Sequence, residues 1–404
     1  MSVRLSRLAQ RIGHSGTMAA DERMQRLRAA GRDIVSLGAG QLDFDTPAPI
    51  AHAGRAAIDE GLTRYTPVAG TPALRGAVRL KFERENGLVY GDDQVIVGAG
   101  AKAVIFHALL ALVDPDDVVL VPSPAWPSYA SMVSLAGGRV VPVPIEAASG
   151  YRLTAAALER AIAAANGRAR GLILNSPHNP TGAVMSAADQ AAIARVASSA
   201  DLWVVSDEIY EHLTYDGPFA SFAAAPGALE RTLTVNGVSK AFAMTGWRIG
   251  YGGGPAPLVR SMEALQSHTS GNASSIAQHA AETALRLTVE GDPAMTAERA
   301  RFRAALIERR DMMCAALAAI PGVSLVKPGG AFYVFADVSR RFGGPVGGRT
   351  VTSSSELADA LLEDAGVAVV PGAVFGDDRA IRMSFASSIE ELAAAMARIR
   401  AALA

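Results

Sequence analysis

Short apolar runs alternate with helix-length amphipathic segments between residues 94 and 251, and this alternation constrains the fold more than any other feature. The runs lie at residues 94–97, 118–121, 139–143, 171–174, 202–206, 232–235 and 249–251. Strands separated by helices predict an α/β fold, with a mainly parallel seven-stranded sheet flanked by helices. Ligands of such sheets bind at the carboxyl ends of the strands, so the residues that follow each run are candidates for a site.

Five of the runs lead directly into polar, aromatic or glycine-rich sequence. These segments read GAGAK (98–102), PSPAWPSY (122–129), NSPHNPTG (175–182), DEIY (207–210) and NGVSK (236–240). We expect them to meet at one rim of the sheet, because parallel strands end at the same edge.

The two ends of the chain have a different pattern. From about residue 294 a long Arg/Glu-rich helix, a strand at 331–336 and a final helix, ELAAAMARIRAALA, predict a separate α+β layer. Before residue 45, a helix and the turn-rich GAGQLDFDTP suit an arm that packs on another domain or subunit. At 404 residues the chain is long enough for two domains. We predict an arm (1–44) packing with the small domain, a large domain (45–291) and a smaller C-terminal domain (292–404).

Composition narrows the possible partners. Lys plus Arg number 38 and Asp plus Glu 39, and this near-balance gives no long-range attraction to nucleic acid or acidic lipid. Neither an apolar export segment nor a run of about 18 apolar residues is found, so no export and no membrane anchor are expected. Cys314 is the only cysteine, which excludes an intrachain disulfide and predicts a buried, inert thiol in the cytoplasm. Small-molecule partners are favoured.

Lysine is scarce in this chain. Only four of the 38 basic residues are lysines (38 − 4 = 34 arginines), and only an amine can form a Schiff base. We predict that Lys81 lies on an exposed helical face near glutamates and that Lys327, before a proline, lies in a solvated loop. Lys102 and Lys240 remain as candidates, each beside glycine-rich sequence.

The segment QVIVGAGAKA matches the glycine pattern of a dinucleotide-binding turn. That fold places an acidic residue at the end of the next strand, whereas here VVLV ends in PSPAW and the acidic residues precede it. A site for a single phosphate monoester at the start of a helix, or a plain helix-starting turn, is therefore the better interpretation.

The other rim segments each have a plain structural explanation as well as a functional one. Trp126 could belong to the core or stack on a planar ring, and Asn179 lies in a proline-rich turn. Asp207 ends a buried run, where a carboxylate needs a positive partner such as a protonated ring nitrogen. The hydroxyl of Tyr210 could reach the same ligand if the chain turns there.

Lys240 adds an amine to this set, and Arg248 adds a guanidinium suited to phosphate. A phosphate cradle, a stacking aromatic ring, an aspartate for a pyridinium nitrogen, partners for a phenolic oxygen and a Schiff-base lysine together describe a pyridoxal 5'-phosphate site.

These residues resemble the fold-type I, class I pyridoxal-phosphate-dependent aminotransferases, in particular the bacterial aspartate aminotransferase branch. The likeness extends over nearly the whole chain. It rests on SLGAG, DFDTP, TRYTPVAGTPALR, GAGAK, SPAWPSY, NSPHNPTG, VSDEIYEHLTY, SKAFAMTGWRIGY, GGAFYVF, VAVVPG and IRMSFA.

The resemblance implies a role for each candidate. Lys240 would form the Schiff base and move the proton, Asp207 would hold the pyridine nitrogen protonated, and Tyr210 would contact the ring oxygen. The implied cofactor-binding set is completed by Gly100, Ala101, Lys102, Trp126, Asn179, Arg248 and, from the partner subunit of a homodimer, the tyrosine that matches Tyr65. The implied substrate set is Arg382 as a clamp for the α-carboxylate, with Gly40, Trp126, Asn179 and Lys102.

The implied reaction is a ping-pong transfer of an amino group from an L-amino acid to a 2-oxo acid. Lys102 and Thr17 match residues that bind a distal carboxylate in relatives, which favours aspartate or glutamate. The basic residue that relatives carry four positions before that threonine is Gly13 here, with Arg11 and His14 nearby. This difference leaves the use of prephenate or aspartate open.

Other departures from the family pattern are Gln41-Leu42, His178, Gly237 and Ser270–Asn272. They either retune the side-chain pocket or have no effect on it. The same site residues could also support a neutral or aromatic substrate, an elimination or another tailoring reaction. A non-catalytic effector-binding module is a further alternative, which the complete catalytic set and the lack of a basic helix-turn-helix segment disfavour.

Overall fold

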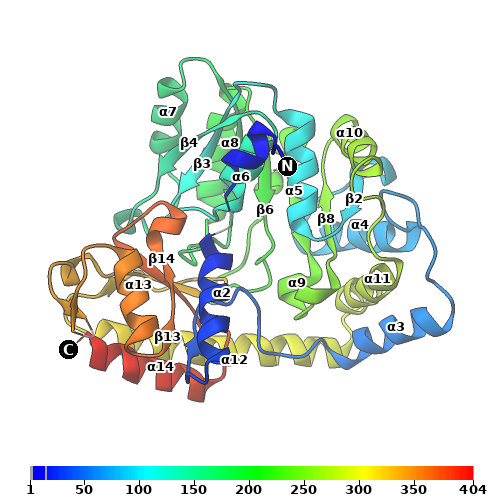
Figure 1. Cartoon of the computed structure of the whole chain (residues 1–404). Helices are drawn as coiled ribbons and strands as arrows, with labels where there is room; N and C mark the ends of the chain where they lie inside the picture. The colour runs from blue at the N-terminus through cyan, green and yellow to red at the C-terminus, as the bar shows by residue number, and fades with distance from the viewer. Residues whose placement is uncertain (1–2, 14–15, 347, 404) are drawn as a thin grey trace.

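The computed structural model describes residues 3–13, 16–346 and 348–403, without the side chains of Arg11 and of residues 16–21. Figure 1 shows a large α/β region, with a smaller region that contains the C-terminus packed beside it. A long helix, α12 (Pro293–Ala318), runs along one edge of both regions. Among the described residues, no helix is long and apolar enough to cross a bilayer.

The large region contains the seven-stranded sheet, and all seven predicted strands lie in it. Its order is β2-β8-β7-β6-β5-β3-β4. The strands are β2 (Val95–Gly98), β3 (Val118–Ser123), β4 (Arg139–Pro144), β5 (Ala169–Asn175), β6 (Trp203–Asp207), β7 (Thr232–Gly237) and β8 (Gly250–Gly253). Only β8 runs antiparallel to its neighbours, β2 and β7. Because of this reversal, β8 starts at the rim where the other strands end.

Helices cover both faces of the sheet. On β3, Val119 and Val121 pack toward α5 (Ala101–Leu112), α6 (Ser128–Leu135) and α10 (Ala256–Ser267). Val118 and Leu120 pack on the opposite face, toward α7 (Ala155–Ala164) and α8 (Ala187–Ser199). Burial of both faces explains why the strands read as continuous apolar runs. Further along that second face, the β2 end of the sheet packs against α4 (Pro72–Asn86) and α11 (Ser275–Val289), and α3 (Ala48–Asp59) packs on α11.

The C-terminal region has its own antiparallel sheet, in the order β14-β15-β10-β9. Its strands are β9 (Ser324–Leu325), β10 (Tyr333–Asp337), β14 (Val370–Pro371) and β15 (Ala380–Ser384). The strand predicted at 331–336 overlaps β10. Helices α12, α13 (Ser354–Glu363) and α14 (Ile389–Ala402) pack around this sheet, and β11 (Pro345–Val346) pairs with β12 (Arg349–Thr350) nearby.

The N-terminal segment contains α1 (Arg7–Arg11), α2 (Gly16–Ala29) and β1 (Val35–Ser36). It contacts the C-terminal region, because β1 pairs in parallel with β13 (Val367–Ala368) and Arg23 forms ion pairs with Asp359 and Glu363. The division into domains at residues 44 and 291 stays a prediction.

The prediction for Lys81 was wrong. Its side chain has no exposed surface and forms an ion pair with Glu211, far away along the chain. Lys81 follows Leu74 and Val78 at helical spacing, so it lies on the buried face of α4. Lys327 and Cys314 lie in the surroundings that were predicted for them, because the Lys327 side chain is half exposed and Cys314 is buried. Burial raises the pKa of the Cys314 thiol to about 11.

Candidate active site

A cavity of about 600 Å³ lies at the rim where the parallel strands of the large sheet end. Segments from the N- and C-terminal regions complete its wall. The residues that the sequence singled out and that line it are Gly40, Ala101, Lys102, Trp126, Asn179, Asp207, Tyr210, Lys240, Arg248 and Arg382. Gly100 lies directly beside Arg248. Tyr65 does not line the cavity of its own chain, and its side chain is 99% exposed.

One end of the cavity suits an anion. Gly100 has φ +87°, and a Cβ there would lie 2.5 Å from Nη2 of Arg248, so only glycine allows the guanidinium to approach the start of α5. The first N–H groups of a helix have no intrahelical acceptors and attract negative charge. Arg248 is held there by a 2.9 Å hydrogen bond from its Nη1 to the carbonyl of Thr245. This arrangement fits a phosphate monoester.

Asp207 is the buried carboxylate of the cavity. Its Oδ2 accepts a 2.6 Å hydrogen bond from the hydroxyl of Tyr129, and the side chain of Asn175 donates to its backbone carbonyl at 2.9 Å. Burial raises the pKa of Asp207 to about 6, while the Tyr129 hydrogen bond and the charge of Lys240 act in the opposite direction. A cationic ligand group beside Asp207 would therefore stabilise the ionised carboxylate.

Lys240 follows β7 on the short helix α9 (Val238–Ala241). Its ammonium donates to the carbonyl of Gly40. Burial, followed by the charges of Arg248 and Arg382, lowers the pKa of Lys240 to about 8, while the charge of Asp207 acts in the opposite direction. An amine in this range is available both as a nucleophile and as a base near neutral pH.

Arg382, on β15, closes the cavity from the C-terminal region. Its Nη1 donates to Oδ1 of Asn179 at 3.0 Å and its Nη2 to the carbonyl of Gly38 at 2.8 Å, while its Nε is buried without an acceptor among the described residues. The guanidinium lies over the ring of Tyr333, 4.3 Å from the centroid. A buried guanidinium with an unused donor suits a carboxylate ligand.

Lys102 and Trp126 lie together at the side of the cavity. The Lys102 Nζ lies 4.9 Å from the centroid of the Trp126 ring, and Tyr129 packs edge-on against the same ring. Burial, followed by the charge of Arg248, lowers the pKa of Lys102. Trp126 can stack on a flat ligand while Lys102 presents a positive charge beside it.

The family model "Aminotransferase class I and II" matches residues 32–399. The chain belongs to this family. It is 45% identical to an aspartate/prephenate aminotransferase of Cereibacter sphaeroides, with 98% of each chain covered, and 43% identical to an aspartate aminotransferase of Rhizobium meliloti, with 97% and 94% covered. It also matches a solved aspartate aminotransferase of Thermus thermophilus with maleate (TM-score 0.92, 42% identity, all of both chains). The predicted family, the fold type and the aminotransferase activity are confirmed.

Class I and II aminotransferases use pyridoxal phosphate, which confirms the predicted cofactor. The cavity of this aminotransferase fits that group on its own evidence: an anion cradle at Gly100 and Arg248, a buried carboxylate at Asp207, and an amine with a lowered pKa at Lys240. The cofactor supplies a ring that withdraws electrons from a substrate carbon. The roles of the individual residues remain proposals.

The departures from the family pattern lie in different places. Gln41 lines the cavity, whereas Leu42 is buried in the core of the C-terminal region. Gly13 is exposed, and residues 270–272 do not line the cavity of this chain. The side chains of Arg11 and Thr17, and His14 as a whole, lie outside the described residues.

Two further departures have a local structural setting. His178 is buried, which lowers its pKa to about 4, and its Nδ1 lies 2.8 Å from the hydroxyl of Thr181 in the same turn. At Gly237, a Cβ would lie 2.9 Å from the carbonyl of Ile249, so the close pairing of β7 and β8 leaves little room for a side chain.

Tyr129, Asn175 and Tyr333 are among the cavity-lining residues of this aminotransferase that sequence reasoning missed. Tyr129 and Asn175 occur within the rim segments, and Tyr129 follows Trp126 by three residues at the start of a helix, which was an available signal. Tyr333 lies on β10, and its hydroxyl is 3.1 Å from that of Tyr210. Nothing local in GGAFYVF indicates that contact.

Proposed function

We propose that this aminotransferase transfers the amino group of L-aspartate or L-glutamate to a 2-oxo acid. The observation that carries the proposal is the excess of positive charge in the cavity. Four cationic side chains line it, Lys102, Lys240, Arg248 and Arg382, against two carboxylates, the buried Asp207 and the exposed Glu22. This positive site suits the anionic groups of the cofactor and of an acidic amino acid, which are one phosphate and two carboxylates.

The relatives support an acidic substrate. Those from Cereibacter sphaeroides and Rhizobium meliloti are named for aspartate, and the Thermus thermophilus enzyme was solved with maleate, a four-carbon dicarboxylate. In this chain, Lys102 is the cation available for a second carboxylate once Arg248 binds phosphate, Arg382 binds the α-carboxylate and Lys240 reacts.

The cofactor would be held by groups from several rim segments. Arg248 and the N–H groups of residues 100–102 bind the phosphate, and Trp126 stacks on the ring. Asp207 keeps a proton on the pyridine nitrogen, because an adjacent carboxylate raises the basicity of that nitrogen. Tyr210 and Asn179 donate hydrogen bonds to the phenolic oxygen.

The substrate would be oriented by its α-carboxylate. Arg382 binds that carboxylate with its planar fork, assisted by the backbone at Gly40. This orientation would bring the α-hydrogen toward Lys240, whose neutral amine would take the proton from the α-carbon. An oxo acid leaves, and a second oxo acid takes up the amino group in a ping-pong sequence.

We further propose that the enzyme is a cytoplasmic homodimer with shared active sites. The exposed phenol of Tyr65 supports this, since it lies outside the cavity of its own chain and is free to reach the phosphate in a partner subunit.

A spectrophotometric screen of amino acids tests the proposed substrate class. Aspartate and glutamate should bleach the absorption band of the bound cofactor, and the product should be the corresponding 2-oxo acid. If neither amino acid bleaches the band, the substrate is a neutral or aromatic amino acid instead. If ammonia is released, the reaction is an elimination and the proposed transfer is wrong.

Lys102→Ala separates the two carboxylate sites. We expect kcat/KM for aspartate to fall about 10²-fold, because a charge-assisted contact in the cavity is lost, while alanine is affected little. Equal losses for both substrates would show that Lys102 serves only the phosphate loop.

A further inference from the structure

The turn that carries Asp207 and Tyr210 is anchored by two buried glutamates. Glu208 accepts hydrogen bonds from two serine hydroxyls and one backbone N–H, at 2.8 to 3.0 Å. Glu211 directly follows Tyr210, and its N–H bonds back to the carbonyl of Glu208 at 2.9 Å. The two carboxylates have different surroundings, because Glu208 contacts neutral donors whereas Glu211 contacts charged ones.

Glu211 lies in a group that we term the Lys81 cluster: Lys81, Glu85, Asn86, Glu211, His212 and Arg299. Lys81 forms an ion pair with Glu211 and donates to Oδ1 of Asn86 at 2.6 Å, and Asn86 in turn donates to Glu211 at 2.7 Å. Burial alone would raise the pKa of Glu211, but the charge of Lys81 and the hydrogen bonds from His212 and Asn86 outweigh burial and hold it well below its usual range. Glu211 is therefore ionised and fixed in place.

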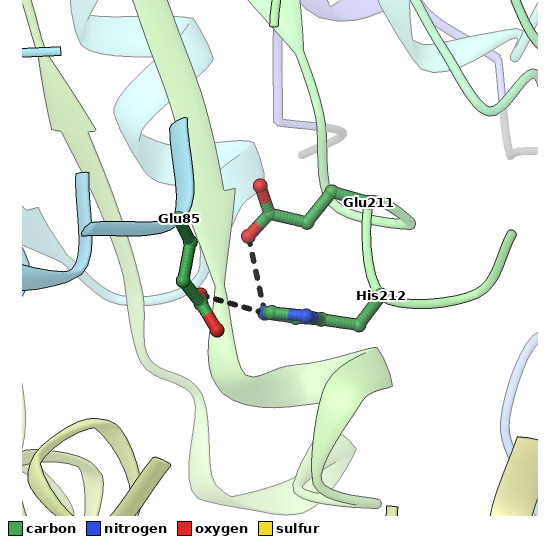
Figure 2. A group of neighbouring side chains, drawn as sticks. All are labelled: Glu85, Glu211 and His212. Carbon is green, nitrogen blue, oxygen red and sulfur yellow. Dashed lines mark ion pairs between the residues drawn. The ribbon is translucent and has the colours of Figure 1, made fainter. Parts of the chain in front are cut away.

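Figure 2 shows the His212 ring between the carboxylates of Glu85 and Glu211, a grouping whose ligand atoms lie within 4.8 Å of one another. A metal ion does not fit there. Lys81 already neutralises Glu211, and Arg299 lies 3.5 Å from Glu85 and also bonds the His212 Nδ1. Two carboxylates matched by two permanent cations leave no charge for a metal to balance.

Arginines of α12 extend this anchoring along the segment after Tyr210. In chain order, Arg299 contacts His212, Arg303 donates to the carbonyls of Thr214 and Tyr215, and Arg310 donates to Asp216. The segment is thus held from α4 on one side and from α12 on the other. Within the cavity, the Tyr210 ring packs on Phe332 and its hydroxyl meets that of Tyr333.

We propose that Lys81 and Glu211 are positioning residues that set the location of the Tyr210 hydroxyl. This inference rests on the proposed function, in which that hydroxyl donates to the phenolic oxygen of the cofactor. The ion pair fixes the backbone one residue beyond Tyr210, and a displacement of about 1 Å at a catalytic group lowers rates by up to roughly 10²-fold. Lys81 acts through Tyr210 and touches neither cofactor nor substrate.

The test uses the cofactor-loaded enzyme and the double variant Lys81→Met/Glu211→Leu. Replacing both partners removes the pair without leaving a buried charge, so the variant should fold. We expect kcat to fall about tenfold or more. The pH titration of the cofactor absorption band should shift toward the curve measured for Tyr210→Phe. Lys327→Met removes an exposed lysine and should leave both measurements unchanged.

A double variant with native kcat and a native titration curve would overturn the proposal and leave the ion pair a purely structural role. If the double variant does not fold, the same two measurements on Arg299→Met, at the partly exposed edge of the cluster, decide in the same way. The underlying function is checked separately, because borohydride reduction of the native enzyme must attach the cofactor to Lys240.

Discussion

Lys81 is fully buried, Lys240 is only partly buried in the wall of the cavity, and the neighbours of the two lysines carry opposite charges. Around Lys240 lie Arg248 and Arg382, with Asp207 as the opposing carboxylate, and its pKa falls to about 8. Around Lys81 lie the carboxylates of Glu211 and Glu85, whose charge is opposite to that of the lysine. Burial by itself therefore does not make a lysine reactive, since Lys81 is the more deeply buried of the two. The sign of the neighbouring charges distinguishes an amine poised for chemistry from an ammonium that holds the fold together.

The largest effects are expected when each lysine is replaced by a neutral residue. One replacement should abolish activity and the other should lower stability. Lys240→Ala should lower transfer activity by at least about 10⁴-fold and leave the protein folded, since both the nucleophile and the base are lost. Lys81→Met should destabilise the protein by about 3–5 kcal/mol, because Glu211 is left buried and unpaired. Activity assays and thermal unfolding of both variants check this. An active Lys240→Ala enzyme would refute the assignment.

Removing a positive neighbour of Lys240 should make its amine more basic, as in a lysine that is surrounded by carboxylates. In Arg382→Gln we expect the pKa of Lys240 to rise, because a like charge is lost, and kcat/KM to fall by about 10²-fold, because the carboxylate clamp is lost. Steady-state kinetics and a pH titration of the cofactor-free protein measure the two effects. Arg379→Gln, an exposed arginine paired with Asp377 nearby, is the matched control and should behave as wild type.

The pH dependence of stability should reveal Lys240 in the cofactor-free protein. Its folded pKa, about 8, lies below the ordinary 10.5, so between these values the unfolded chain binds one more proton. The free energy of unfolding should therefore rise with pH across this window, by up to about 3 kcal/mol, and this gain should disappear as the pH falls toward 8. Chemical denaturation at several pH values measures the slope. The slope should vanish in Lys240→Met, and its persistence there would assign it to another group.

The smallest effect concerns the carboxylate that faces Lys240. Tyr129→Phe removes a hydrogen bond that lowers the pKa of Asp207, so that pKa should rise above about 6. We expect activity to fall roughly tenfold and the acidic limb of the pH profile to move to higher pH. Tyr151→Phe, a buried tyrosine outside the cavity, serves as the control. An unchanged acidic limb would show that Tyr129 only supports the Trp126 ring.

The same two lysines show how far sequence reasoning reaches. Lys240 follows an apolar strand and precedes a glycine-rich segment, so the rule for ligands at strand ends located it, as it did Asp207 and Asn179. Lys81 was misassigned because its partner, Glu211, lies on a distant segment and a lysine in a helix reads as a surface residue. Helical spacing from Leu74 and Val78 contained the correct signal.

The cavity shows a similar limit. Groups on the large sheet were predictable from local patterns, whereas Tyr333 and the carbonyl of Gly38 reach the site only through tertiary packing. Arg382 was placed by family resemblance alone, since nothing in the periodicity of IRMSFA indicates a clamp.

The reversed strand β8 has a consequence for how this enzyme can change. Gly237 and Gly250 pair across β7 and β8, so the chain from Lys240 to Arg248 forms one closed loop at the rim. Two of the proposed cofactor contacts, Lys240 and Arg248, thus belong to a single short segment, while two of the proposed substrate contacts, Gly40 and Arg382, lie near the two ends of the chain. Sequence drift in those distant segments can alter substrate choice without loosening the cofactor. A family built in this way can acquire new substrates while its cofactor-binding loop stays unchanged.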